Sequence, residues 1–405
     1  MKTTCASSSP KSNRPATAAI LTTGCRLNQS ESDALRQQLL LQGVRIVADP
    51  ADADVCYVNT CTVTAAADRS SMQLLHRARR AAAHVVALGC LAERDPERLQ
   101  AAGADETWTN DHKQEQLAGI TPLPERSRAL LKVQDGCRRR CSYCAVSGLR
   151  GEPKSLPVAD ALRQFDDLTG SGFNEVVLTG LNLGTYDDAG TTLTGLVARL
   201  LERPGAARIR IGSIEPDTVG DELIRLLSHP RLCPHLHLPL QSGDDVVLHA
   251  MRRPYASSDY ERLVARVRTA CPDCSIGADV IAGFPGEDDA AFDRTLELVE
   301  RTQLSYLHAF TFSARPGTDA ACGAAIPVAM ARYRVHRLRA VSENHRQAFE
   351  RRFIGTVRRA IVETPRSALT DNYLRLDVNG RGLARGDLVP LLVQRTDGRL
   401  SGDPC

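Results

Sequence analysis

Residues 133–151 read VQDGCRRRCSYCAVSGLRG and place Cys137, Cys141 and Cys144 in the spacing C-x3-C-x2-C. The apolar segment ALLKVQ (129–134) is expected to be the first strand of a barrel, which puts the cysteines near its carboxyl end, where such barrels carry their active sites. A structural zinc site uses four ligands, usually in two spaced pairs. An iron–sulfur cluster also binds thiolates, and three of them leave one iron without a protein ligand. The count of three therefore favours a catalytic cluster over a closed zinc site.

Strand-like and helix-like segments alternate from residue 131 to the arginine-rich segment 328–352. The expected strands are ALLKVQ, EVVLTG (175–180), RIRIGS (208–213), HLHLPL (235–240), SIGADVIAG (275–283) and LSYLHAFTF (304–312). Helical segments such as VADALRQFDDLTG (158–170) and AAFDRTLELVERT (290–302) separate them. Because six such units are fewer than the eight of a closed barrel, the pattern predicts a partial (β/α)6 barrel over residues 129–352.

The flanking segments predict two further domains and a tail, which makes the fold class α/β. Residues 1–16 are polar and are expected to be a disordered tail. Over residues 17–119, the strands AAILTTG (18–24), DVCYVNT (54–60) and HVVALGC (84–90) alternate with helical segments, which predicts an open parallel sheet. Over residues 353–405, short strands separated by turn residues predict a small antiparallel β-barrel.

A second set of cysteines lies in the first domain. Cys25, Cys61 and Cys90 each come just after an expected strand. Because the carboxyl ends of parallel strands converge on one crevice, these three thiols are expected to meet there, again without a fourth. The chain has 13 cysteines and its polar start predicts no export signal, so metal binding or catalysis is expected in place of a disulfide scaffold. Cys271 and Cys274 form a C-x2-C pair without partner ligands and are expected to be structural.

The charge and hydropathy of the chain narrow the classes of partner that it can bind. The formal net charge is +3, and residues 331–359 contain nine arginines and two glutamates. This segment is either a solvated helix face or a surface that contacts RNA. No apolar run approaches the roughly 18 residues of a membrane span, so we expect no membrane partner and a cytoplasmic location.

Several longer sequence motifs surround the two cysteine sets. They are GC-x-x-N-x-x-E-S (24–32), NTCTV (59–63), GC (89–90), VVLTGLNLGTY (176–186), SIEP (213–216), HLHLPLQSGDD (235–245), DVIAGFPGE (279–287), HAFTFSARPGT (308–318) and LTDNYLRL (369–376). Together they resemble the methylthiotransferases, a branch of the radical S-adenosylmethionine (SAM) superfamily, over essentially residues 17–400. The last phrase resembles the TRAM domain, a small RNA-binding barrel.

The resemblance implies two [4Fe-4S] clusters and SAM as cofactors. Cys137, Cys141 and Cys144 would hold the cluster that binds and cleaves SAM, and Cys25, Cys61 and Cys90 would hold an auxiliary cluster that carries the inserted sulfur. The strand ends that would contact SAM are Thr179, Gly180, Asn182, Ser213, Glu215, Gln241 and Gly283. Both clusters would have to face a common cavity, which predicts that the first domain docks over the mouth of the barrel. A reductant such as flavodoxin or ferredoxin and a sulfur donor are further expected partners.

Three branches of this family differ in substrate: isopentenyladenosine in tRNA, threonylcarbamoyladenosine in tRNA, or an aspartate of a ribosomal protein. The motifs NTCTVT, SYLHAFTFSARPGT and LTDNYLRL are most similar to those of the second branch. That branch acts at position 37 in the anticodon stem-loop. The segment SGLRG (147–151) and Pro239 differ from the residues usual in the second branch. The residues expected to contact RNA are Arg351, Arg352, Arg358, Arg359, Asn372 and Tyr373.

Two function classes compete with the enzyme. One is a non-catalytic RNA-binding protein with structural clusters, and the strand-end phrases expected to bind SAM argue against it. The other is a scaffold stabilised by zinc, which analysis of bound iron and sulfide would distinguish from two [4Fe-4S] clusters.

Overall fold

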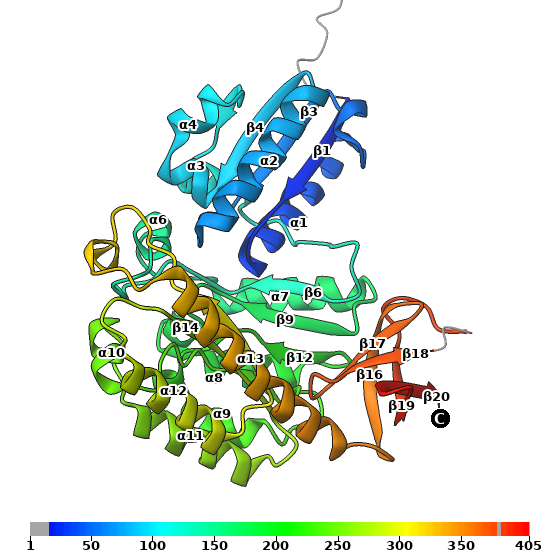
Figure 1. Ribbon diagram of the computed structural model, residues 1–405. Helices are drawn as coiled ribbons and strands as arrows, with labels where there is room; N and C mark the ends of the chain where they lie inside the picture. The colour runs from blue at the N-terminus through cyan, green and yellow to red at the C-terminus, as the bar shows by residue number, and fades with distance from the viewer. Residues whose placement is uncertain (1–15, 379–381, 405) are drawn as a thin grey trace, which may run out of the picture.

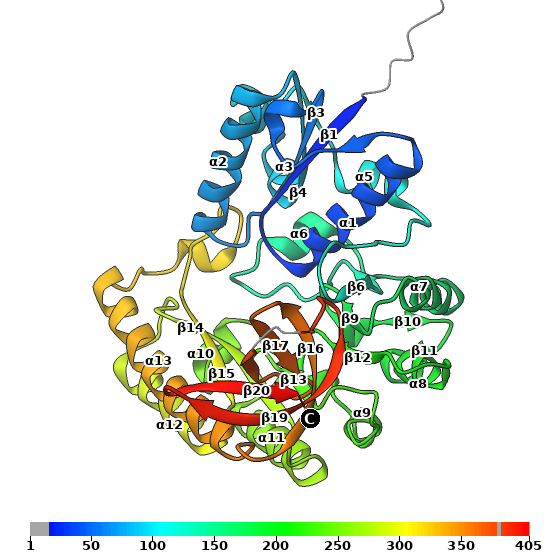
Figure 2. The same ribbon diagram turned by 90° about the vertical axis from the view of Figure 1, so that its right-hand side faces the viewer.

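The computed structural model describes residues 16–378 and 382–404 and has three parts (Figure 1). The first domain lies along the open side of the central barrel, and the C-terminal β-barrel packs against the amino ends of the barrel strands (Figure 2). Among the described residues, no helix has the length and apolar character needed to cross a membrane. The predicted class, α/β with a partial barrel between a parallel-sheet domain and a small closed barrel, is confirmed.

The first domain is a five-stranded parallel sheet in the order β2-β1-β3-β4-β5. Its strands are β1 (Thr17–Thr22), β2 (Arg45–Ile46), β3 (Val55–Thr60), β4 (His84–Gly89) and β5 (Glu106–Thr107). Its helices are α1 (Arg26–Leu41), α2 (Ala65–Ala81), α3 (Cys90–Arg94), α4 (Pro96–Ala101) and α5 (Asn110–Leu117). The central strands are almost fully buried because helices cover both faces, as expected for parallel strands made of continuous apolar runs.

The central barrel consists of two three-stranded sheets, β12-β9-β6 and β13-β14-β15, joined by isolated bridges such as Ile209 to Leu232. Its strands are β6 (Ala129–Lys132), β9 (Glu175–Thr179), β12 (Arg208–Ile211), β13 (His235–His237), β14 (Ser275–Ala282) and β15 (Tyr306–Thr311). Because β6 and β15 are edge strands, the barrel stays open along one side, as six units require. A short antiparallel pair, β7 (Gln134–Asp135) and β8 (Lys154–Ser155), follows β6.

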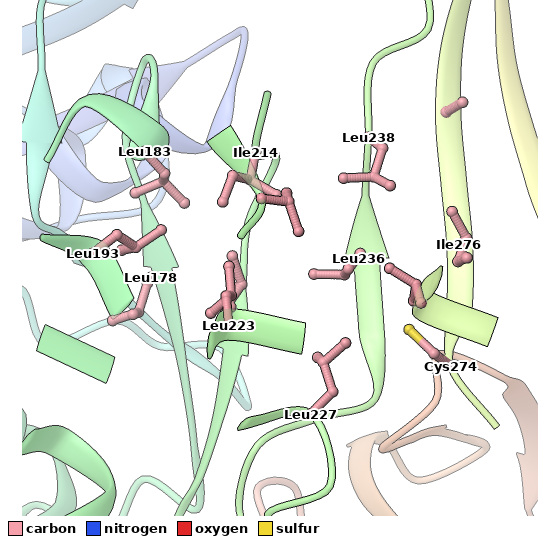
Figure 3. Packing of buried hydrophobic residues seen from close by; sticks show 14 of the residues in the cluster. Leu178, Leu183, Leu193, Ile214, Leu223, Leu227, Leu236, Leu238, Cys274 and Ile276 are labelled. Atoms are coloured by element: carbon pink, nitrogen blue, oxygen red, sulfur yellow. The ribbon is translucent and has the colours of Figure 1, made fainter. Parts of the chain in front are cut away.

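Helices cover the outer face of these strands. They are α7 (Val158–Gly170), α8 (Leu193–Glu202), α9 (Asp221–Leu226), α10 (Asp245–Ala250), α11 (Ser257–Ala270), α12 (Asp289–Thr302) and α13 (Val328–Arg351), and a short α6 (Val146–Arg150) follows the cysteine loop. The main apolar core lies between strands and helices and includes Leu178, Leu236 and Ile276 (Figure 3). Cys271 and Cys274 belong to this core, so the C-x2-C pair is structural, as predicted.

The C-terminal strands close into a barrel in the order β16-β17-β18-β20-β19. They are β16 (Val357–Thr364), β17 (Ser367–Thr370), β18 (Arg375–Val378), β19 (Leu388–Thr396) and β20 (Arg399–Pro404). Four pairings are antiparallel, but the closing pair of β18 and β20 is parallel, which the alternating turn pattern did not indicate. Phe349 and Phe353 at the end of α13 complete the core of this small barrel.

Candidate active site

The loop after β7 carries Cys137, Cys141 and Cys144 around a cavity of about 850 Å³. The backbone N–H of Cys137 donates to the carbonyl of Gly151 (3.0 Å), and that of Cys144 donates to the carbonyl of Cys141 (3.0 Å). Gly136 has φ of +73°, and a Cβ there would lie 2.0 Å from the carbonyl oxygen of Glu152. The turn that presents these thiols therefore requires glycine.

Polar side chains from the neighbouring strand ends contact the thiols of this loop. Nη1 of Arg253 lies 3.5 Å from Sγ of Cys141, and Nδ2 of Asn182 lies 3.8 Å from Sγ of Cys137. Glu215 forms an ion pair with Arg253 and lies 3.5 Å from Arg139. Burial raises the pKa of Cys137 and Cys144, so their thiolates need cationic or metal partners.

The seven strand-end residues predicted to contact SAM have different surroundings, and none of them lines the cavity. Asn182 and Glu215 reach the cysteine loop as described above, and the buried Oδ1 of Asn182 has no partner among the described residues. Thr179, Gly180, Ser213 and Gln241 lie at or just beyond the carboxyl ends of their strands, and Gln241 adopts φ of +68°. Gly283 packs against α13, where a Cβ would lie 2.6 Å from that of Ala331, so helix packing accounts for this glycine.

The cavity is lined by loops of both domains and not by the ends of the barrel strands. The lining is made by the cysteine loop and its continuation to Glu152, by Arg252, by residues 316–319 after β15, and by Arg94 of the first domain. Periodicity could not indicate this lining because it depends on how the first domain docks.

Cys25, Cys61 and Cys90 meet at the carboxyl edge of the first sheet. A Cβ on Gly24, which has φ of +107°, would lie 2.6 Å from Cβ of Cys61. Burial raises the pKa of Cys61 to about 11, and the neighbouring Cys25 and Cys90 act in the same direction. Cys61 and Cys90 are buried, whereas Cys25 is exposed. The sequence prediction that these three positions share one crevice is consistent with this placement.

Arg150, at the end of α6, joins the two cysteine sets. Its Nε lies 3.4 Å from Sγ of Cys90, and its Nη2 donates to Oδ1 of Asn28 (3.0 Å). Its Nη1 donates to Glu31 (2.8 Å) and to Asp135 (3.0 Å). Because α6 begins two residues after Cys144, this one side chain connects the loop of the first set to the crevice of the second.

A buried charge cluster surrounds Arg150. Lys113 donates to Glu31 (2.9 Å), and Lys132 contacts both Glu31 (3.3 Å) and Asp135 (3.2 Å). Burial acts to raise the pKa of Glu31, but the charges of Arg150, Lys113 and Lys132 hold it well below its usual range. These groups come from both domains, so the cluster fixes how the first domain sits on the barrel.

A second buried link lies beside Cys61. Nη2 of Arg315, in the loop after β15, donates to Asp68 (2.6 Å) and to Thr62 (2.9 Å) of the first domain. Arg94 also pairs with Asp68 (3.0 Å). The first domain thus contacts loops at the barrel mouth, but among cysteines only those of the barrel set line the cavity, so the common cavity for both sets stays a prediction.

Both cysteine sets fit the iron–sulfur clusters that the fold implies. Each set offers three thiols, and among residues 16–378 and 382–404 no three His, Cys, Asp or Glu side chains are close enough to hold a single metal ion. A closed zinc site uses four ligands, so the three thiols of either set are a poor fit to it.

The residues predicted to contact RNA separate into two groups. Arg351, Arg352 and Arg359 are exposed on α13 and β16, whereas Arg358 is bound between Asp371 and Asp273. Asn372 is fully buried, and Tyr373 turns inward with φ of +69° to stack on His235 at a centroid distance of 4.1 Å. Asn372 does not lie on the surface, because its loop packs into the central barrel, and the RNA contact of the half-buried Tyr373 stays a prediction.

Sequence reasoning missed Arg150, Asp135, Lys113, Lys132 and Arg315. A signal was present for their partners, since Asn28 and Glu31 lie three residues apart on α1 and share its buried face with Leu35. Two polar residues on the buried face of an amphipathic helix indicate a buried polar partner.

Comparison with known proteins places these features in a family. The model of the Radical SAM superfamily matches residues 131–299, and that of Uncharacterized protein family UPF0004 matches residues 17–109. The threonylcarbamoyladenosine tRNA methylthiotransferase MtaB of Thermotoga maritima is 35% identical over 86% of this chain and 86% of its own length. The protein of the same name from Aquifex aeolicus is 34% identical over 93% of this chain and 99% of its own length.

A relative with a different substrate is almost as similar. The tRNA-2-methylthio-N(6)-dimethylallyladenosine synthase of Novosphingobium aromaticivorans is 33% identical over 88% of this chain and 89% of its own length. Among solved structures, the radical SAM methyltransferase TsrM of Kitasatospora setae has the same fold, with a TM-score of 0.60 at 14% identity over 76% of this chain and 77% of that one. The chain, with one cysteine set on a radical SAM barrel and another on its first domain, belongs to the radical SAM methylthiotransferase family.

Proposed function

We propose that the enzyme methylthiolates C2 of N6-threonylcarbamoyladenosine at position 37 of tRNA, giving 2-methylthio-N6-threonylcarbamoyladenosine. The observation that carries the proposal is the pair of three-cysteine sets on the two sides of one buried domain interface, linked there by Arg150. Such an arrangement suits insertion of sulfur at an unactivated C–H, where acid–base groups have little effect. The names of the relatives from Thermotoga maritima and Aquifex aeolicus support this substrate.

The residues of the chain have distinct roles in this proposal. Cys137, Cys141 and Cys144 would bind one [4Fe-4S] cluster, and Cys25, Cys61 and Cys90 would bind the other. When bound, the two clusters and SAM supply the radical, the sulfur and the methyl group.

Nearby polar groups of the chain support these ligands. Arg253 and Asn182 donate toward the thiolates of the barrel set, and Arg150 places Cys90 relative to that set. The first domain contributes Arg94 to the cavity wall at the barrel mouth, where it would limit the access of water to the reaction.

The exposed arginines near the end of α13 and on β16 would contact phosphates of the anticodon stem-loop. A reductant such as flavodoxin or ferredoxin and a sulfur donor would serve the enzyme in the cytoplasm, where its tRNA substrate is found.

The test is expression of the chain in a bacterium that lacks its own enzyme for this modification, followed by mass spectrometry of tRNA nucleosides. Appearance of 2-methylthio-N6-threonylcarbamoyladenosine is the expected result. A methylthio group on dimethylallyladenosine alone would assign the chain to the other tRNA branch. Unchanged tRNA together with a modified ribosomal protein would contradict the proposal.

A further inference from the structure

A second cavity, of about 220 Å³, lies where the three parts of the chain meet. The first domain provides Arg26 and Gln29, and the segment entering β6 provides Arg126, Ser127, Arg128 and Leu130. Val177 of β9 forms part of the wall, and the C-terminal barrel adds Glu363 and Arg385. Four arginines therefore surround a space that has one carboxylate in its lining.

Two of these arginines already have partners. Nη2 of Arg128 lies 2.7 Å from Glu363, and Nη1 of Arg126 donates to Oε1 of Gln29 (3.0 Å) while the same guanidinium pairs with Asp33. Among the described residues, the side chains of Arg26 and Arg385 make no hydrogen bond and no ion pair. The cavity thus has two guanidinium groups whose donors are available to a ligand.

The chain balances this positive charge only in part, since Arg126 pairs with Asp33 and Arg128 with Glu363 and Glu175. Burial, together with the charges of Arg128 and Arg385, lowers the pKa of Arg126 to about 10. Burial also lowers the pKa of His308 on β15, and the charge of Arg26 contributes to that shift. An anion bound between the arginines would relieve this repulsion.

The cavity lies beside the expected reaction centre. Arg26 directly follows Cys25 and begins α1, so its backbone adjoins the auxiliary cysteine set. Val177 points to the same face of β9 as Glu175 and Thr179, opposite the face whose Val176 and Leu178 pack against the helices. The cavity therefore opens between the auxiliary set and the interior of the barrel.

We propose that this cavity binds an oxyanion of the RNA substrate through Arg26 and Arg385. The inference rests on the proposed function and adds a substrate-binding site to it. Guanidinium groups suit carboxylates and phosphates because their planar donors match two oxygens at once.

Two parts of the RNA have this chemistry. One is the free carboxylate of the threonylcarbamoyl group, which a dimethylallyl group lacks, and the other is a backbone phosphodiester. In the first case the site would also select the substrate.

The experiment uses the full chain with both clusters reconstituted and measures binding of fluorescent anticodon stem-loops by anisotropy. Position 37 carries threonylcarbamoyladenosine, its carboxamide analogue or dimethylallyladenosine. The variants are Arg26→Gln and Arg385→Gln, and Arg80→Gln on the exposed face of α2 is the matched control for loss of one positive charge. Iron content and thermal unfolding verify that each variant is folded.

Both variants are expected to bind the threonylcarbamoyl RNA about ten-fold more weakly than the wild type, while the control does not. Loss confined to that RNA identifies the carboxylate as the ligand, and equal loss for all three RNAs identifies a phosphate. Binding of every RNA within about two-fold of the wild type by both variants would overturn the inference.

Turnover by the wild type separates the two proposals. If the wild type methylthiolates the threonylcarbamoyl RNA and both variants bind like the wild type, only the oxyanion site is wrong. If the wild type leaves that RNA unmodified, the proposed function itself is wrong.

Discussion

At the scale of single residues, Arg150 is the most consequential side chain that the structure identifies. A buried guanidinium is tolerated only with carboxylate and hydrogen-bond partners, and Glu31, Asp135 and Asn28 provide them. Although Arg150 belongs to a helix of the barrel, its side chain contacts Cys90 in the auxiliary crevice of the first domain. One residue thereby relates the positions of both cysteine sets.

We expect Arg150→Gln to destabilise the chain by about 3–5 kcal/mol, because Glu31 and Asp135 lose their shared cation in a buried site. The variant should also change the EPR spectrum of the reduced auxiliary cluster, which a purely structural loss elsewhere would leave unaltered. Urea unfolding and EPR measure the two effects. Arg138→Gln is the control, because Arg138 pairs with Glu152 at an exposed position and should contribute no more than about 1 kcal/mol.

The two cysteine sets should be separable by single substitutions. Cys141→Ser is expected to abolish reductive SAM cleavage, whereas Cys61→Ser should retain it and lose methylthio transfer. Bound iron should fall from about eight to about four per chain in each variant, since each loses one cluster. Iron analysis and quantification of 5′-deoxyadenosine test this. Cys274→Ser, in the apolar core, should keep both clusters, and loss of SAM cleavage in Cys61→Ser would contradict the assignment.

At the scale of elements, the first turns of α1 and the short α6 form the junction of the two domains. The buried face of α1 presents Asn28, Ser30 and Glu31 to the barrel, and Oγ of Ser30 donates to the carbonyl of Leu130 at 3.4 Å. Helix α6 meets this face through Arg150 and also packs against α3, which begins with Cys90. The junction is therefore polar, buried and dependent on charge.

Glu31 should make this junction sensitive to acid. Because its pKa in the folded chain lies below its ordinary value of about 4.3, its stabilising effect is complete above that pH and is lost as the pH falls further. The difference in unfolding free energy between wild type and Glu31→Gln should be about 3–5 kcal/mol at pH 7 and should shrink below about pH 4. Urea unfolding of the chain before cluster loading measures it. A difference that is independent of pH would contradict the role of the Glu31 charge.

At the scale of the whole molecule, buried arginines also attach the C-terminal barrel. Arg208 and Arg210 of β12 share Glu175 and donate to backbone carbonyls of residues 359 and 369–371. Tyr373 then stacks on His235 inside the central barrel. The small barrel is thus an integral part of the molecule.

Arg210→Met should loosen this attachment, because Glu175 would lose one of its two closest cations and two carbonyls would lose their donor. We expect a loss of about 3–5 kcal/mol and faster proteolytic cleavage near residues 352–356. Limited proteolysis with mass spectrometry identifies the cleavage site. The exposed Arg199→Met on α8 serves as the control, and an unchanged digestion pattern in Arg210→Met would contradict this role.

The sequence by itself determined the fold class, the positions of the main strands along the chain and the placement of six cysteines just after strands. These features depend on local information: the periodicity of apolar residues, turn residues and the spacing of thiols directly after strands. The expected strands at 54–60, 175–180 and 275–283 correspond to β3, β9 and β14 for this reason.

Only the tertiary structure decided which residues connect the parts. Glu31 and Arg150 are 119 residues apart in the chain, and no local pattern specifies that their charges compensate each other. The same is true of Asn372, which a local motif placed on an RNA-binding surface and which packing turned inward. Buried charges and loop positions depend on the docking of whole domains, because their energy comes from partners that the neighbouring sequence does not contain.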